Sequence, residues 1–264
     1  MSVFDELGDG IFRRRYESMD LNIGVVIGAE AVLIVDSRET HRQADVLRDE
    51  LCTLTRLPVG WVVNTHYHWD HTWGNARFPE AALWGHDKCR RVMLENEDEA
   101  RQSAIDWLPA EYHSDINEVV ITPPEHTFTS TTAINLGNRT VGLSYHGLGH
   151  TNSDIVIRAD DVLFAGDLVE ESGPPFFGDG FPLDWGPTLT AMDVPDVVVP
   201  GHGDTVDAAF ITTQSEEIEG VALLAREGHT DGASISDLVS RGPYPAEVMH
   251  SALTRAYAQL NGEL

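Results

Sequence analysis

The sequence has few cysteines, few basic residues and no long apolar run. Its 264 residues include two cysteines, Cys52 and Cys89, too few for a disulfide framework and typical of a reduced cytosolic chain with two buried thiols. The most apolar segment, residues 23–35, is interrupted by Glu30 and is shorter than the about 18 residues that a membrane span needs. The N-terminal residues lack an apolar core, so we expect no secretory signal and a cytoplasmic location.

Positive charge is scarce as well. Lys and Arg total 17 against 43 Asp and Glu, the net charge is −26, and Lys88 is the single lysine. A surface this acidic repels phosphate backbones and anionic membranes. We therefore expect a small-molecule substrate, no nucleic-acid partner and no membrane partner, and the oligomeric state stays open. The densest basic run, residues 13–15, is interpreted as a solvated face rather than a site for an anionic substrate.

Strand-like and helix-like patterns alternate along the chain. Runs rich in β-branched residues predict strands at 23–28, 31–35, 61–64, 82–85, 132–136, 140–145, 154–158, 162–165 and 196–199. Helical spacing predicts helices at 39–55, 86–110, 207–227, 234–240 and 246–260. Residues 167–185, rich in Gly, Pro and Phe, predict a loop. This order indicates a layered α/β fold.

A cluster of metal-binding side chains follows the predicted strand 61–64. His66, His68, Asp70 and His71 have the form H-x-H-x-D-H, which arises by chance in roughly 2 of 1,000 chains of this composition. In an extended turn His66 and His68 lie on one side, so both imidazoles can bind one cation at about 2.0–2.1 Å. Asp70 and His71 point elsewhere and can hold a second cation. The alternative is that the histidines are polar caps at the end of a strand.

Three more positions have a similar character. His150 follows Gly149, Asp167 follows Gly166, and His202 lies between two glycines, each after a predicted strand. The glycines let the backbone bend close to a ligand, and a sheet can direct side chains from its strand ends into a shared cleft. Singly these are interpreted as loop residues, but together with the first motif they predict metal ligation.

This order of residues resembles the ligand set of the metallo-β-lactamase superfamily, most closely its dinuclear glyoxalase II-like and lactonase-like hydrolases, over about residues 23–204. The resemblance implies a four-layer αββα sandwich with the metal site at one edge of the two sheets. From length and element order we expect one domain, residues 1–264, in which 1–205 form the metal-binding sandwich and 206–264 form helices packed as an outer layer or cap. The resemblance also implies a division of the ligands: His66, His68 and His150 on a first metal, Asp70, His71 and His202 on a second, and Asp167 bridging.

The same resemblance implies a hydrolase. Five imidazoles and two carboxylates fit two Zn²⁺ per chain best, with Fe or Mn as alternatives. A bridging water would be ionised and attack an acyl carbon in a thioester, lactone or amide, while Asp70 orients that nucleophile or shuttles its proton. A mononuclear-iron oxidoreductase resembling persulfide dioxygenases is the alternative, and a binding protein that kept the fold is a third class.

Aromatic residues near these motifs are candidates for contacts with an apolar part of the substrate. Alternatively, two or three of them pack in the core. The candidates are Tyr67, Trp69, Trp73, Phe176, Phe177, Phe181 and Trp185.

Overall fold

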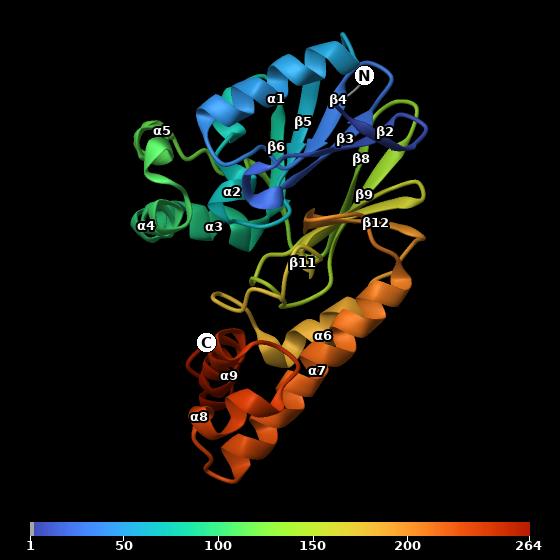
Figure 1. The fold of residues 1–264 in the computed structure, drawn as a ribbon. Helices are drawn as coiled ribbons and strands as arrows, with labels where there is room; N and C mark the ends of the chain where they lie inside the picture. Colours follow the sequence, from blue (N-terminus) through green and yellow to red (C-terminus); the bar gives the residue numbers. More distant parts are fainter. Residues whose placement is uncertain (1–2) are drawn as a thin grey trace.

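Two β-sheets packed face to face form the centre of the molecule (Figure 1). The computed structural model describes residues 3–264. The seven-stranded sheet has the order β1-β2-β3-β4-β5-β6-β7; it is antiparallel from β1 to β4 and parallel from β4 to β7. Its strands are β1 (Asp5–Gly8), β2 (Ile11–Arg15), β3 (Asn22–Ile27), β4 (Val32–Val35), β5 (Val59–Val63), β6 (Ala82–His86) and β7 (His126–Phe128).

The five-stranded sheet has the order β12-β11-β10-β9-β8, and its β11 and β12 run parallel. Its strands are β8 (Thr131–Asn135), β9 (Thr140–Tyr145), β10 (Ile155–Ala159), β11 (Val162–Glu170) and β12 (Val197–His202). An isolated bridge between Leu21 and His202 joins the two sheets at the carboxyl end of β12. Carboxyl ends of parallel strands meet at one edge of a sheet, which is where α/β folds place their ligand sites.

Alternating side chains explain why β4 is apolar at every position. Leu33 and Val35 pack into the core between the sheets, whereas Val32 and Ile34 pack beneath α1 (His41–Leu54). A strand covered on both faces reads as a continuous apolar run. Each such side chain contributes about 1.5–3 kcal/mol when it is fully buried.

Helices cover the outer face of each sheet, which confirms the four-layer αββα sandwich. α1 begins at the N-cap Thr40, whose hydroxyl accepts a hydrogen bond from Gln43 N, and packs on the seven-stranded sheet. The five-stranded sheet is covered by α6 (Pro182–Thr190), α7 (Ala208–Thr230) and α9 (Ala246–Asn261), which share one apolar cluster with it (Figure 1). No helix within residues 3–264 is long and apolar enough to cross a membrane.

Four short helices form a group beside the seven-stranded sheet. They are α2 (Trp69–Thr72), α3 (Asp87–Glu95), α4 (Glu97–Trp107) and α5 (His113–Glu118), and α8 (Ile235–Leu238) lies separately between α7 and α9. Trp69, Trp73, Ala104 and Ile116 form a small apolar cluster in this group. The helix expected at 86–110 is therefore two helices, because Asn96 leaves the helical conformation and the three acidic residues after it begin a new helix.

Other expectations were wrong in detail. β1, β2 and β7 were not expected from the sequence, and the loop expected at 167–185 is shorter because β11 extends to Glu170 and α6 begins at Pro182. The basic run 13–15 is not a solvated face, since its arginines form ion pairs with carboxylates on neighbouring elements. Cys52 is exposed, and Cys89 is buried as expected. Met1 and Ser2, where the segment examined for a secretory signal begins, lie outside the described residues.

Candidate metal centre

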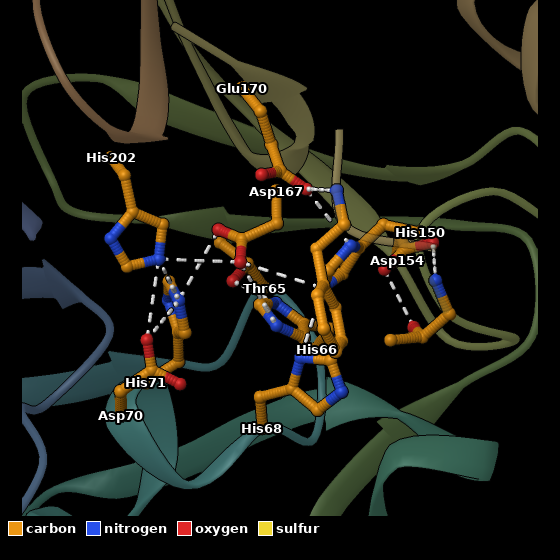
Figure 2. Close-up of polar contacts among 12 residues, drawn as sticks. Thr65, His66, His68, Asp70, His71, His150, Asp154, Asp167, Glu170 and His202 are labelled. Carbon is orange, nitrogen blue, oxygen red and sulfur yellow. Dashed lines mark hydrogen bonds and ion pairs between the residues drawn. The ribbon is translucent and has the colours of Figure 1, made fainter. Parts of the chain in front are cut away.

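The seven polar side chains singled out in the sequence meet at one edge of the two sheets (Figure 2). They come from four places: the β5–α2 connection and α2 supply His66, His68, Asp70 and His71, the β9–β10 connection His150, β11 Asp167, and β12 His202. His68 immediately precedes the single turn of α2, so the helix turns Asp70 and His71 away from His66 and His68. Residues 66–71 thus supply metal-ligand atoms to both groups of the cluster.

The first group consists of three imidazoles. His150 Nε2 lies 2.9 Å from His68 Nδ1. Asp167 Oδ2 lies 3.7 Å from His66 Nε2 and 3.5 Å from His150 Nε2. His66 Nε2 is buried and has no hydrogen-bond partner. Its lone pair therefore points into the cluster without a donor to satisfy it, which is costly unless a cation or proton binds there.

The second group lies on the other side of Asp167. His71 Nε2 lies 3.3 Å from His202 Nε2. Asp70 Oδ2 lies 3.2 Å from His71 Nε2 and 3.3 Å from His202 Nε2. Asp167 reaches this group too, with Oδ1 3.2 Å from His71 Nε2 and Oδ2 3.3 Å from His202 Nε2. Figure 2 shows the Asp167 carboxylate between the two groups.

These separations fit tetrahedral metal sites. Four ligands at 2.0–2.1 Å from a zinc ion lie about 3.3 Å from one another. The separations given above run from 2.9 to 3.7 Å, and all donor atoms of each group lie within 4.8 Å of one another. The inner atoms are imidazole nitrogens and carboxylate oxygens, which zinc and other divalent metals prefer. The residues present therefore fit two cations.

Outer contacts orient the rings. The outer nitrogens of four imidazoles face hydrogen-bond acceptors: Thr65 Oγ1 at 3.0 Å from His66 Nδ1, Asp179 Oδ2 at 3.0 Å from His68 Nε2, Asp36 Oδ2 at 2.8 Å from His71 Nδ1, and Met19 O at 2.7 Å from His202 Nδ1. The outer nitrogen of His150, Nδ1, lies 3.2 Å from Glu170 Oε1 as an ion pair and has no hydrogen bond among the described residues. An acceptor on the outer nitrogen places the ring proton there and leaves the inner lone pair for a metal.

Electrostatics favour positive charge at this point. Burial lowers the pKa of His66 well below its ordinary value, so this ring is neutral. Burial opposes protonation of His71 too, but the carboxylates of Asp167, Asp70 and Asp36 raise its pKa well above the usual range. Conversely, although burial raises the pKa of Asp167, His71 and His202 hold it well below its ordinary value. The carboxylates thus attract positive charge, whether protons or cations carry it.

The residues that hold the rings were not predicted from the sequence. Asp36 follows β4, and its Oδ1 accepts a hydrogen bond from Thr65 N at 2.8 Å while its Oδ2 accepts one from Thr65 Oγ1 at 2.8 Å. Its sequence signal, an acidic residue just after a predicted apolar strand, is similar to that of Asp167, which follows the predicted strand 162–165 after one glycine. Glu170 and Asp179 lie inside the segment expected to be a loop, where sequence offered no spacing rule.

A cavity of about 720 Å³ opens from the cluster. Of the aromatic candidates, Tyr67, Trp69, Trp73, Phe176 and Phe177 line it. Phe181 and Trp185 are not among its lining residues in the described part of the chain. Trp185 is fully buried and donates a hydrogen bond from Nε1 to Leu168 O, because α6 turns it into the apolar cluster beneath the five-stranded sheet. The Phe181 ring lies against the Arg255 guanidinium.

Comparison with known proteins decides the family. The sequence profile described as "Metallo-beta-lactamase superfamily" matches residues 21–202. The chain belongs to this superfamily. The match contains all seven residues of the cluster, and it confirms the resemblance found in the sequence.

Curated relatives of this chain carry the name acyl-coenzyme A thioesterase MBLAC2. The proteins from Bos taurus and Homo sapiens are each 27% identical over 241 residues, covering 76% of this chain and 81% of theirs. That from Gallus gallus is 28% identical over 209 residues, covering 71% of this chain and 70% of its own. Membership of the superfamily and these relatives support a hydrolase.

Solved structures show the same fold. The DIM-1 metallo-beta-lactamase exposed to ceftazidime matches with a TM-score of 0.63 and 19% identity, over 82% of this chain and 95% of that one. A metallo-beta-lactamase from Pontibacter korlensis gives 0.63 and 17%, over 81% and 98%. A double mutant of the sec-alkyl sulfatase PisA1 gives 0.78 and 14%, over all of this chain but 51% of that one.

Proposed function

We propose that this protein is a dinuclear metal-dependent hydrolase that cleaves an acyl bond in a small molecule. The observation that carries the proposal is the cluster itself. Seven donor-bearing side chains turn their inner atoms toward two points. Four of the five imidazoles have a hydrogen-bond acceptor on the outer nitrogen, and the fifth, His150, has the Glu170 carboxylate 3.2 Å from its outer nitrogen. A set of merely structural histidines does not need such matched pairs.

The chain would divide its ligands as the two groups do. A first ion would be held by His66 and His68 from the β5–α2 connection and by His150 from the β9–β10 connection. Asp70, His71 and His202 would hold a second, with Asp167 between them. Zn²⁺ is the proposed metal, and iron or manganese is compatible with the same donors. When bound, such ions lower the pKa of a water toward neutrality and polarise a carbonyl oxygen.

The chain's own groups then handle orientation and proton transfer. Asp70 lines the cavity and lies beside His71 and His202, where its carboxylate can orient the attacking water and take its proton. The Tyr67 hydroxyl donates a hydrogen bond to Asp179 Oδ2 at 3.2 Å, which steadies the carboxylate that contacts His68. Because the water is the nucleophile, no covalent acyl-enzyme is required.

Among acyl bonds we propose the thioester as the first choice, with lactones and amides next. The curated relatives are named as acyl-coenzyme A thioesterases, and the cavity has apolar walls that suit an acyl chain. We further propose that the enzyme acts on a freely diffusing small molecule in the cytoplasm, and that residues 1–264 form one domain whose terminal helices complete the cavity.

Metal content and turnover test this proposal together. Protein stripped by chelation is expected to lack activity on a panel of thioesters, lactones and amides, and two zinc ions per chain, counted by mass spectrometry, should restore it. His68→Ala and Asp167→Ala should bind less metal and lose nearly all turnover while keeping the circular dichroism of the parent. His229→Ala, on α7 away from the cluster, is the matched control and should keep both. Full activity in verified metal-free protein, or one iron per chain with oxygen uptake, would contradict the proposal.

A further inference from the structure

Two exposed aromatic rings meet at the mouth of the cavity. Trp107 at the end of α4 is 57% exposed and Phe176 in the loop after β11 is 41% exposed, yet their rings contact edge to face at 5.9 Å. Both line the cavity. Large apolar side chains exposed side by side at a cavity mark a surface that a ligand covers.

Phe176 is held next to the cluster. Its backbone N donates a hydrogen bond to Glu170 Oε1 at 3.0 Å, the same oxygen that faces His150. Its ring rests on Gly178, where a Cβ would lie 2.3 Å from the ring. The ring centre is thereby 6.4 Å from that of His68 and 6.1 Å from that of His150. An apolar surface thus runs from the cluster to Trp107.

Outside the metal cluster, the charge on the cavity walls is of one sign. Within residues 3–264 its lining includes no lysine or arginine, whereas Glu99 on α4 and Glu247 on α9 are exposed acids on its walls. Two arginines contact wall residues but are engaged elsewhere. Arg101 lies over the Trp73 ring and donates to backbone carbonyls of α5 and the segment after it, and Arg255 donates to the carbonyl oxygens of Asp179 and Gly180.

We propose that this cavity selects acyl substrates with an apolar acyl chain and a leaving group that bears no negative charge, so that a neutral thioester is preferred over the coenzyme A thioester of the same acid. This proposal rests on the proposed function and narrows its substrate class. The Trp107–Phe176 wall provides the apolar surface, and each methylene buried there raises kcat/KM up to about fourfold. The acidic walls repel the phosphates of coenzyme A and offer them no cation.

The experiment compares four thioesters on the zinc-loaded enzyme: acetyl and octanoyl esters of N-acetylcysteamine, which is uncharged, and of coenzyme A. We expect kcat/KM for the octanoyl ester of N-acetylcysteamine to exceed that of the acetyl ester at least about tenfold. It should also exceed that of octanoyl coenzyme A about tenfold at low salt, and this second ratio should shrink at high salt because salt screens the repulsion.

Variants separate the two selectivity elements. Glu99→Lys combined with Glu247→Lys should raise kcat/KM for octanoyl coenzyme A about tenfold and leave the neutral ester within twofold. Glu216→Lys combined with Glu227→Lys, both on α7 and outside the cavity lining, makes the same change in net charge and is the control. Trp107→Ala should lower the ratio of octanoyl to acetyl kcat/KM about tenfold. Leu223→Ala is its control, because Leu223 is also an exposed apolar residue but lies on α7, outside the cavity lining.

Binding gives a readout that does not depend on turnover. The non-hydrolysable thioether S-octyl-N-acetylcysteamine should bind more tightly than S-octyl-coenzyme A, measured by calorimetry and by tryptophan fluorescence. Coenzyme A compounds that bind and turn over as well as the neutral ones at low salt, or an octanoyl-to-acetyl ratio near one, would overturn the inference. If none of the four thioesters is hydrolysed but the neutral thioether binds more tightly, the selectivity stands and the choice of thioester as substrate falls; inactivity on the lactones and amides as well would overturn the proposed function.

Discussion

Replacing Asp36 with Asn tests whether the outer contacts of the rings control metal binding. Asp36 is 2% exposed and accepts three hydrogen bonds, two from Thr65 and one from His71 Nδ1. Its φ of 65° is a conformation that Asn also tolerates, so the backbone need not change. An Asn side chain keeps one acceptor oxygen but places an NH₂ group where Oδ2 meets two donors. His71 must then accept at Nδ1 and carry its proton on Nε2, the inner atom.

The expected magnitude follows from this tautomer change. Loss of an outer partner weakens metal binding by about 10–100-fold, which is about 1.4–2.7 kcal/mol. The weakening should affect one of two sites, since His71 belongs to the group with Asp70 and His202. The metal-free variant should also lose about 2–4 kcal/mol of unfolding free energy, because buried donors are left without their charged acceptor. Zinc titration against a chromophoric chelator and urea unfolding measure the two effects.

A second buried carboxylate provides the control. Asp154 is also 2% exposed and accepts hydrogen bonds from Thr151 N and Oγ1 at 2.7 and 2.6 Å, with no imidazole among its hydrogen-bond partners in the described residues. Asp154→Asn should cost a similar unfolding free energy while both zinc affinities stay within about threefold. Asp36→Asn protein that binds two zinc ions with the affinities of the parent would refute the tautomer argument.

Three further predictions concern the frame of the site. In Gly201→Ala, the new Cβ would lie 1.7 Å from Asp167 Oδ1, so metal affinity measured by chelator competition should fall at least about 100-fold with unchanged circular dichroism; unchanged affinity would disprove the close approach. Trp185→Ala should cost about 3–5 kcal/mol in urea unfolding, and a lower kcat/KM without that cost would instead make Trp185 a substrate contact. Burial raises the pKa of Glu50, but its ion pair with Arg14 lowers that pKa overall, so the carboxylate stabilises the fold above about pH 4 and loses this effect as the pH falls through its folded pKa. Glu50→Gln should therefore lower the free energy of unfolding by about 2 kcal/mol at pH 7 and by much less at pH 3. An equal loss at both pH values would contradict this prediction.

The sequence allowed the cluster to be predicted where chemistry imposes local spacing. His66, His68, Asp70 and His71 lie within six consecutive residues, and His150 and His202 each follow a glycine after a predicted strand, so their pattern is visible in the chain. The contact between Asp36 and His71 joins residues 35 positions apart, and no spacing rule connects them. Such partners become recognisable only when the fold places them.

The missed elements also have a physical reason. β2 carries three consecutive arginines that are neutralised by carboxylates from other segments, so its sequence does not alternate as a strand usually does. α6 contains Pro187 and Gly186, which disfavour a helix locally, and its packing in the cluster of α7 and α9 overrides that preference. Because α6 was not predicted, Trp185 was interpreted as a candidate substrate contact, although the helix turns it into the core.

Metal binding and substrate choice depend on different parts of this chain. All seven cluster residues lie within residues 21–202, the part that matches the superfamily, and most come from strands or the connections between them. The cavity walls around the cluster come largely from α3, α4 and the loop after β11, which lie inside the match, and from α9, which begins 44 positions beyond it. Changes in those walls leave the donor atoms in place, so relatives can share the metal chemistry and differ in substrate. The charge and apolar surface of the walls are therefore a better guide to the substrate of this protein than the substrates in its relatives' names.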